Sequence, residues 1–80
     1  MEPMPETLSR EFVNRKTGDT FAVSYARRPT GHWVFVTGPF GAPSFGPVVS
    51  QDVEAARKTW RMIVANLTRT GFVPVTPTGN

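Results

Sequence analysis

Three segments in the first half of the chain are typical of β-strands, and the middle one alternates cleanly between its two faces, as a half-buried strand does. They span residues 8–15, 20–27 and 32–37, and the last of them is a run rich in β-branched and aromatic residues. Residues 16–19 and 28–31 separate these segments, and each of these short stretches contains a glycine that suits a turn. The pattern therefore predicts an antiparallel meander of three strands.

The alternation also predicts which side chains share a face of the sheet. In the second strand the apolar side chains on one face are Phe21, Val23 and Tyr25. In the third strand Trp33 and Phe35 fall on one face, and Val34 and Val36 fall on the other. The pattern leaves open which of these two pairs faces the helix. If the valines face it, Trp33 and Phe35 are open to solvent or covered by a loop.

After residue 50 the apolar spacing changes to that of a helix, and we expect one long helix over residues 51–70. Its apolar stripe consists of Val53, Ala56, Trp60, Ile63, Val64 and Leu67. Ser50 is placed as the N-cap, and the carboxylates of Asp52 and Glu54 in the first turn complement the helix dipole.

The end of this helix is also readable from the sequence. Gly71 is placed as the residue after the C-cap, and Phe72 would then contact Leu67, as in a Schellman motif. Residues 72–75 follow as an edge strand, where a proline is tolerated. The expected fold class is α+β: a small antiparallel β-meander of three to five strands packed against one long C-terminal helix.

The segment Gly38–Pro47 is unusual, because it holds three glycines and three prolines. These residues exclude a helix and interrupt a strand, so we expect a loop followed by a short strand at Val48 and Val49. The loop also contains Phe40 and Phe45. Two interpretations follow: the two rings fold back as a lid on the core, or they form an exposed aromatic contact surface.

A chain of 80 residues is one small domain, which we expect over residues 8–75, with a disordered lead-in at 1–7 and a flexible tail at 76–80. The absence of cysteine excludes disulfides and thiolate metal sites. The first residues are acidic and rich in proline, unlike a signal peptide, and no apolar run approaches the roughly 20 residues of a membrane span. These features predict a cytoplasmic protein that does not enter a membrane.

The net charge is +3, but it is distributed unevenly along the chain. Residues 1–19 hold four acids and three bases, whereas residues 20–80 hold two acids and six bases. Seven of the nine bases are arginine, whose planar donor group suits phosphate or carboxylate. The basic part of the chain therefore favours an anionic partner such as nucleic acid.

Candidate catalytic chemistry is sparse. His32 is the single histidine, so with no cysteine the chain has no usual zinc ligand set, and we expect a surface residue at the end of a strand. The acids are few and scattered, and the glycines of the loop are not followed by the lysine of a phosphate-binding loop. We therefore expect neither enzyme activity nor a bound cofactor or metal.

Short matches along the chain resemble a known family. Phe21 opens the second strand, and Ala56 and Trp60 lie four residues apart on the helix. The end of the helix reads Leu67-Thr68-Arg69-Thr70-Gly71-Phe72. In these features and in the order of its elements, the chain resembles the WGR domain over about residues 8–75. That family has a small antiparallel sheet with one long helix and occurs in poly(ADP-ribose) polymerases and in short bacterial proteins. The resemblance implies a role in binding DNA ends and partner domains.

The motif that names the family is replaced in this chain. Where Trp-Gly-Arg-Ile-Gly is expected, the sequence is Thr37-Gly38-Pro39-Phe40-Gly41, which keeps the two glycines alone. The tryptophan and arginine that carry the family's contacts are thus missing. The resemblance therefore bears on the fold more than on DNA-end binding.

Together these observations predict a small binding module that is not an enzyme. We expect it to bind DNA or RNA through a basic surface of the helix and the sheet. The residues assigned to this contact are Arg27, Arg28, Trp33, Arg57, Lys58 and Arg61, with the arginines and the lysine on phosphates and Trp33 stacking on a base. The alternative is a protein-interaction module, either an adaptor or inhibitor of the phage or plasmid type or a homodimer, with Phe40 and Phe45 as its contacts.

Overall fold

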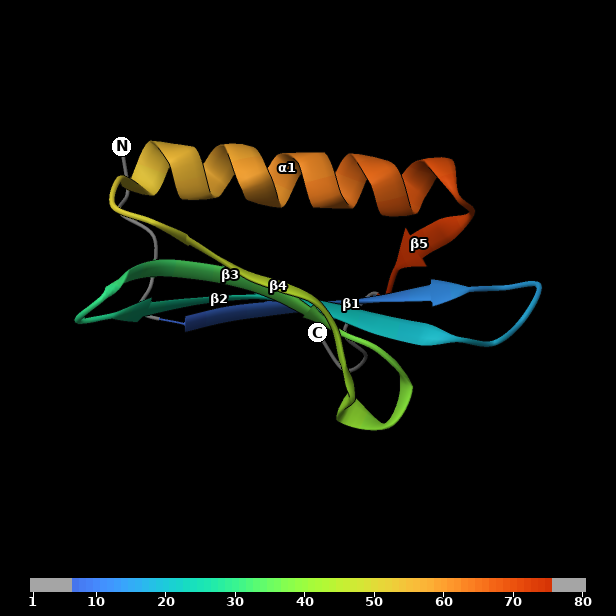
Figure 1. The fold of residues 1–80 in the computed structure, drawn as a ribbon. Coiled ribbons are helices and arrows are strands. Elements are labelled where there is room, and N and C mark those ends of the chain that lie inside the picture. Colours follow the sequence, from blue (N-terminus) through green and yellow to red (C-terminus); the bar gives the residue numbers. More distant parts are fainter. Residues whose placement is uncertain (1–6, 76–80) are drawn as a thin grey trace, which may run out of the picture.

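The computed structural model describes residues 7–75 and shows one antiparallel sheet with one helix lying across it (Figure 1). In chain order the elements are β1 (Thr7–Asn14), β2 (Thr20–Arg28), β3 (Gly31–Thr37), the short 3-10 helix η1 (Pro39–Gly41), β4 (Pro43–Ser50), α1 (Val53–Arg69) and β5 (Phe72–Pro74). The α+β prediction is confirmed, with five strands and a single long helix. Predictions for residues 1–6 and 76–80 lie outside the described residues.

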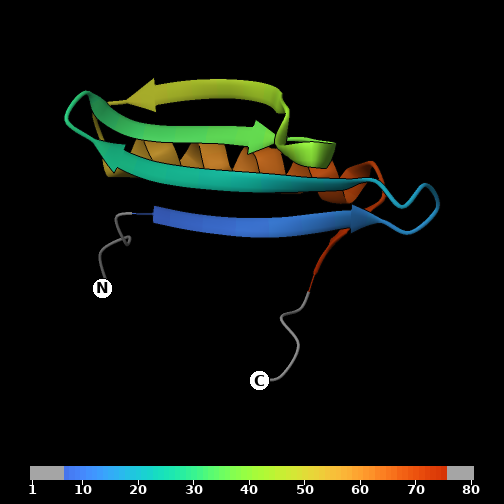
Figure 2. The same ribbon diagram turned by 90° about the horizontal axis from the view of Figure 1, so that it is seen from below.

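The sheet has the strand order β4-β3-β2-β1-β5, and all its neighbours are antiparallel (Figure 2). The first four strands follow one another along the chain and form the predicted meander. The chain then crosses the sheet as α1 and returns as β5, which pairs with β1 at the far edge. This order leaves β4 and β5 as the two edge strands.

The core lies between the sheet and α1. One buried cluster gathers around Phe12, Val23 and Val36, and a second around Tyr25, Val34 and Ala56. The helical residues packed against them are Trp60, Ile63, Val64 and Leu67, which belong to the predicted stripe. Each fully buried valine contributes about 1.5–3 kcal/mol relative to an exposed one. The choice left open by the sequence is thereby settled: the valines of β3 face the helix, and Trp33 and Phe35 lie half-buried on the opposite face.

The start of α1 differs from the prediction. Ser50 is not the N-cap, because it is still paired with His32 as the last residue of β4. Asp52 takes the N-cap position with an extended backbone, and the helix begins at Val53. The N-terminal boundary is therefore set by where the edge strand ends, which the helical pattern alone does not reveal.

The predicted long loop before the helix is also corrected. Only Gly38 to Ala42 turns around η1, and β4 already begins at Pro43. The strand tolerates Pro43 and Pro47 because it is an edge strand, and its pairing with β3 is irregular around Val36. Glycines and prolines thus bend this strand rather than abolish it.

The glycine that follows the helix lies where the sequence predicted it, whereas the predicted contact of Phe72 with Leu67 stays a prediction. Gly71 has a φ of 98°, in the left-handed region that favours glycine, and its amide donates to the carbonyl of Thr68 at 3.2 Å. The edge strand β5 comes next, and the ring of Phe72 meets Phe21 edge-to-face with centroids 5.1 Å apart. Within residues 7–75, none of the helices is both long enough and apolar enough to cross a membrane.

Candidate functional site

A basic surface lies at the N-terminal half of α1, and Arg57 is its central residue. Arg57 lines two neighbouring hollows, of about 350 and 160 Å³. Arg27 lines the larger one and Arg61 the smaller one. Lys58 is exposed on the same turn of the helix. We call these four residues the basic surface: Arg27, Arg57, Lys58 and Arg61.

The alternation of β2 explains why Arg27 belongs to this surface and Arg28 does not. Arg27 is paired with His32 and lies two residues after Tyr25, so it shares the face that the helix covers. Arg28 is the next residue and faces the other way. The structure therefore brings together four of the six residues assigned to nucleic-acid contact.

Two carboxylates lie beside Arg57, the central residue of this surface. The Oε2 atom of Glu54 lies 3.2 Å from Nη1 of Arg57, one helical turn away. Asp52, the N-cap residue, lines the larger hollow with Arg27 and Arg57. Over its 17 residues α1 carries four bases and the single acid Glu54, so its outward face is positive. Lys58 and Arg61 are exposed there.

Two stacked rings, those of Tyr25 and His32, line the larger hollow. The hydroxyl of Tyr25 and Nδ1 of His32 are 2.6 Å apart, and the two rings stack with centroids at 5.9 Å. Tyr25 is buried and His32 is half-buried. His32 lies near the start of β3 and lines an open hollow, as expected of a surface residue at the end of a strand, and the hydrogen bond holds its imidazole against the sheet.

The other two assigned residues lie on the face of the sheet away from α1. The guanidinium of Arg28 sits 5.1 Å from the ring centroid of Trp33, within the range of a cation–π contact. The indole Nε1 of Trp33 donates to the hydroxyl of Thr30 at 2.9 Å. Arg28 and Trp33 thus form a second cluster, which the sheet separates from the basic surface.

The two aromatic residues of the predicted loop lie in different places, Phe40 in the turn of η1 and Phe45 on β4 opposite Val36. Phe40 is fully exposed, and its backbone has φ 64° and ψ 20°, in the left-handed region. Phe45 is 51% exposed. The interpretation of these rings as a lid is therefore wrong for Phe40, because the turn of η1 holds this residue outside the sheet.

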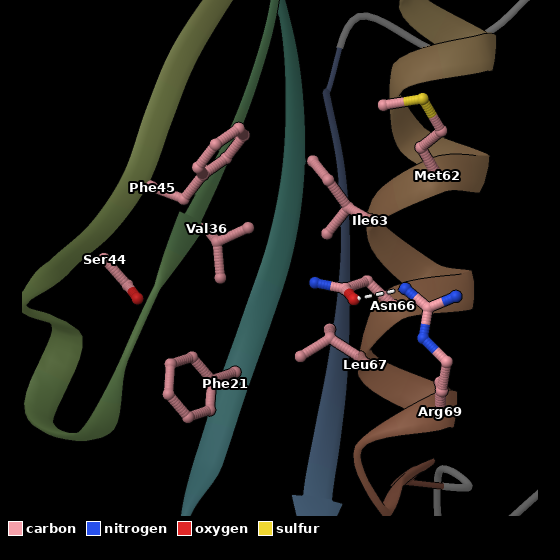
Figure 3. A pocket seen from close by; sticks show the side chains of 9 residues that line it. All are labelled: Phe21, Val36, Ser44, Phe45, Met62, Ile63, Asn66, Leu67 and Arg69. Carbon is pink, nitrogen blue, oxygen red and sulfur yellow. Dashed lines mark hydrogen bonds between the residues drawn. The ribbon is translucent and has the colours of Figure 1, made fainter.

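A groove runs between β3, β4 and the C-terminal half of α1 (Figure 3). It has a volume of about 550 Å³. Its lining side chains are Phe21, Val36, Ser44, Phe45, Met62, Ile63, Asn66, Leu67 and Arg69. The wall is mostly apolar, and Met62 is 63% exposed on the helix side. We call this feature the β4–α1 groove.

The sequence reasoning missed Met62 and the groove it lines. The sequence contained a signal for this groove, because Met62 is a large apolar residue of the helix that does not belong to the buried stripe. Arg69, at the end of the groove, is held by a hydrogen bond from Nη2 to Oδ1 of Asn66 at 2.7 Å. What the sequence could not supply was the position of β4, which forms the other wall.

No family model, curated protein or solved structure matches this chain. The resemblance to the WGR domain therefore stays a prediction. Along residues 7–75, histidine and carboxylate side chains nowhere gather in groups of three that could hold a metal ion.

Proposed function

We propose that this chain is a non-catalytic module that binds nucleic acid through the basic surface. The observation that supports this most is the position of Arg57, which borders one hollow with Arg27 and the next with Arg61. Three guanidinium groups from β2 and α1 are thereby collected at one end of the helix. The ammonium group of Lys58 extends the same surface.

The chemistry of these side chains fits phosphate. Arginine offers two parallel N–H donors to one phosphate, and lysine adds a point charge. Lys58 and Arg61 are three residues apart, so about 4.5 Å of helix axis separates them. Double-stranded DNA carries one negative charge per about 1.7 Å of its axis, so neighbouring cations of the helix can reach neighbouring phosphates.

A salt titration tests this proposal. Labelled single-stranded DNA, duplex DNA and RNA are titrated with the protein, and fluorescence anisotropy is followed at several salt concentrations. If all four cations contact phosphates, the slope of log K against log salt on duplex DNA is about −3.6, since each contact contributes about −0.9. A weaker slope means that fewer phosphates are contacted.

Two matched double variants distinguish binding at the basic surface from a general effect of positive charge. Lys58→Gln with Arg61→Gln removes two charges from the basic surface, whereas Arg15→Gln with Lys16→Gln removes two charges after β1. All four side chains are exposed, so both double variants should fold. The helix variant should flatten the slope by about 1.8 and weaken binding, while the control should change binding little.

Two results would contradict the proposal. One is the absence of binding at low salt with tens of micromolar protein, and the other is an equal effect of both double variants. A third variant, Trp33→Leu, decides whether the opposite face takes part. Because Trp33 and Arg28 lie across the sheet from the basic surface, we expect this variant to bind as the wild type does.

A further inference from the structure

Phe40 occupies a position that its own copy of the chain does not explain. A bulky residue in the left-handed backbone region is strained, and glycine or asparagine would sit there more easily. The side chain is fully exposed, so the ring buries no apolar area within its own copy that would offset this strain. Strain combined with full exposure points to a contact made with another molecule.

The β4–α1 groove is a receptor of matching chemistry for an aromatic ring. Phe21, Val36, Ile63 and Leu67 form its floor, and the two rims carry Phe45 and Met62 (Figure 3). A volume of about 550 Å³ is ample for one phenyl side chain. The thioether of methionine adapts its shape readily to an incoming ring. The groove therefore offers burial to a ring such as that of Phe40.

The charge pattern favours a second copy of this chain as the partner. From Gly38 to Gln51 the chain contains no charged residue, although its net charge is +3. Two copies that meet along this stretch bring no like charges together there, and Arg69 lies only at the end of the groove. Lys58 of the basic surface lies one helical turn before Met62 on the rim of the groove, but the turn that would enter the groove carries no charge for it to repel.

The backbone of the edge strand β4 is poorly suited to pairing with a second copy, so a contact there depends on side chains. Pro43 and Pro47 have no amide hydrogen to donate, and the register of β4 against β3 shifts around Val36. Extension of the sheet from one copy into the next is therefore disfavoured. What the edge still offers is the groove above it and the exposed ring of Phe40 beside it.

The positions of the ring and the groove are compatible with two-fold symmetry. Figure 1 shows η1 on the side of the sheet away from α1, whereas the groove lies on the side of α1. A two-fold axis beside β4 and parallel to the strands interchanges these two sides. The turn of one copy then lies against the groove of the other, and the arrangement closes at two copies.

The interface that a stable dimer needs covers only a small share of the surface of one copy. A standard interface buries about 800 Å² on each partner, which is about 14% of the 5744 Å² exposed by one copy. From these observations we propose that the chain forms a symmetric homodimer in which Phe40 of each copy inserts into the β4–α1 groove of the other. This contact is separate from the basic surface, so the two proposals can fail independently.

Sedimentation equilibrium and light scattering on the full chain test the dimer, between about 10 µM and 1 mM protein. We expect a monomer–dimer equilibrium with a dissociation constant below about 100 µM. Phe40→Ser removes the inserted ring, and Met62→Glu places a charge in the groove. Each should raise the dissociation constant at least about thirty-fold, the effect of losing a central aromatic contact. Val75→Ser, at the opposite edge of the sheet, is the matched control and should leave it unchanged.

Mixing the two variants tests whether the ring of one copy enters the groove of the other. The Phe40→Ser chain keeps an intact groove and the Met62→Glu chain keeps an intact ring, so an equimolar mixture can form one of the two contacts. We expect the mixture to dimerise more strongly than either variant alone and more weakly than the wild type. Circular dichroism melts check that both variants fold.

Three outcomes would overturn the inference. A wild-type chain that stays monomeric at about 1 mM leaves the groove to some other partner. A dimer that survives both single variants uses another surface. A mixture no more associated than its components rules out exchange of ring and groove. None of these results depends on whether the basic surface binds nucleic acid.

Discussion

Replacing Phe40 with asparagine should make the single copy more stable, although it removes a large aromatic side chain. The backbone at this residue has φ 64° and ψ 20°, a conformation that costs an ordinary residue about 1–2 kcal/mol and that asparagine adopts more readily. The ring is fully exposed, so its removal gives up no buried apolar area. We therefore expect a gain of about 1 kcal/mol in the free energy of unfolding, or about 4–8 °C in Tm for a domain of this size.

The measurement is a urea or thermal unfolding curve followed by circular dichroism. It is made at protein concentrations low enough that Tm no longer depends on concentration, so that dimer formation does not contribute to stability. Phe40→Ala is the matched control, because alanine also lacks the ring but keeps the strained backbone, and it should leave stability nearly unchanged. The difference between the asparagine and alanine variants isolates the backbone term. A loss of stability in the asparagine variant would refute the reasoning, since it would show that the ring packs within its own copy.

Two further predictions concern the end of the sheet where β2 turns into β3, at the opposite end of β3 from η1. Tyr25→Phe removes the hydroxyl that lies 2.6 Å from Nδ1 of His32, and it should cost about 1 kcal/mol in a denaturant titration. A double-mutant cycle with His32→Phe should show coupling of similar size, and additive losses would mean that the hydrogen bond contributes nothing. Gly31→Ala should cost at least about 1–3 kcal/mol, because φ is 136° there and a Cβ atom would lie 2.8 Å from the carbonyl oxygen of Ser50. An alanine variant that melts with the wild type would contradict this.

The sequence predicted the elements whose signal is local. Alternation in β2 placed Phe21, Val23 and Tyr25 on the buried face, and Gly71 marked the end of the helix, because backbone geometry alone decides both features. The start of α1 was misplaced, since pairing of Ser50 with His32 across the sheet extends β4 to that residue. Composition also misled at Pro43, where position at the sheet edge outweighs a poor strand propensity.

The candidate sites were predictable only in part, for a similar reason. Charge and residue type identified Arg57, Lys58 and Arg61, which lie close together because they share one helix. Neither feature could show that Arg27, and not Arg28, lies on the helix side of the sheet, because that depends on which face of β2 the helix covers. The β4–α1 groove was beyond reach, since its two walls come from segments brought together only by the fold.

The strand order has a consequence for how the domain opens and closes. The meander pairs strands that follow one another in the chain, whereas β1 and β5 pair residues as far apart as Phe12 and Pro74. Closing a loop of about 60 residues costs about 1.6 kcal/mol more than closing one of about 10. A strand of three residues meets that cost only with help from the side chain of Phe72 against Phe21. Hydrogen exchange should therefore find β5 among the first segments to detach and β2 and β3 among the last, so the C-terminal strand opens locally while the rest of the sheet stays paired.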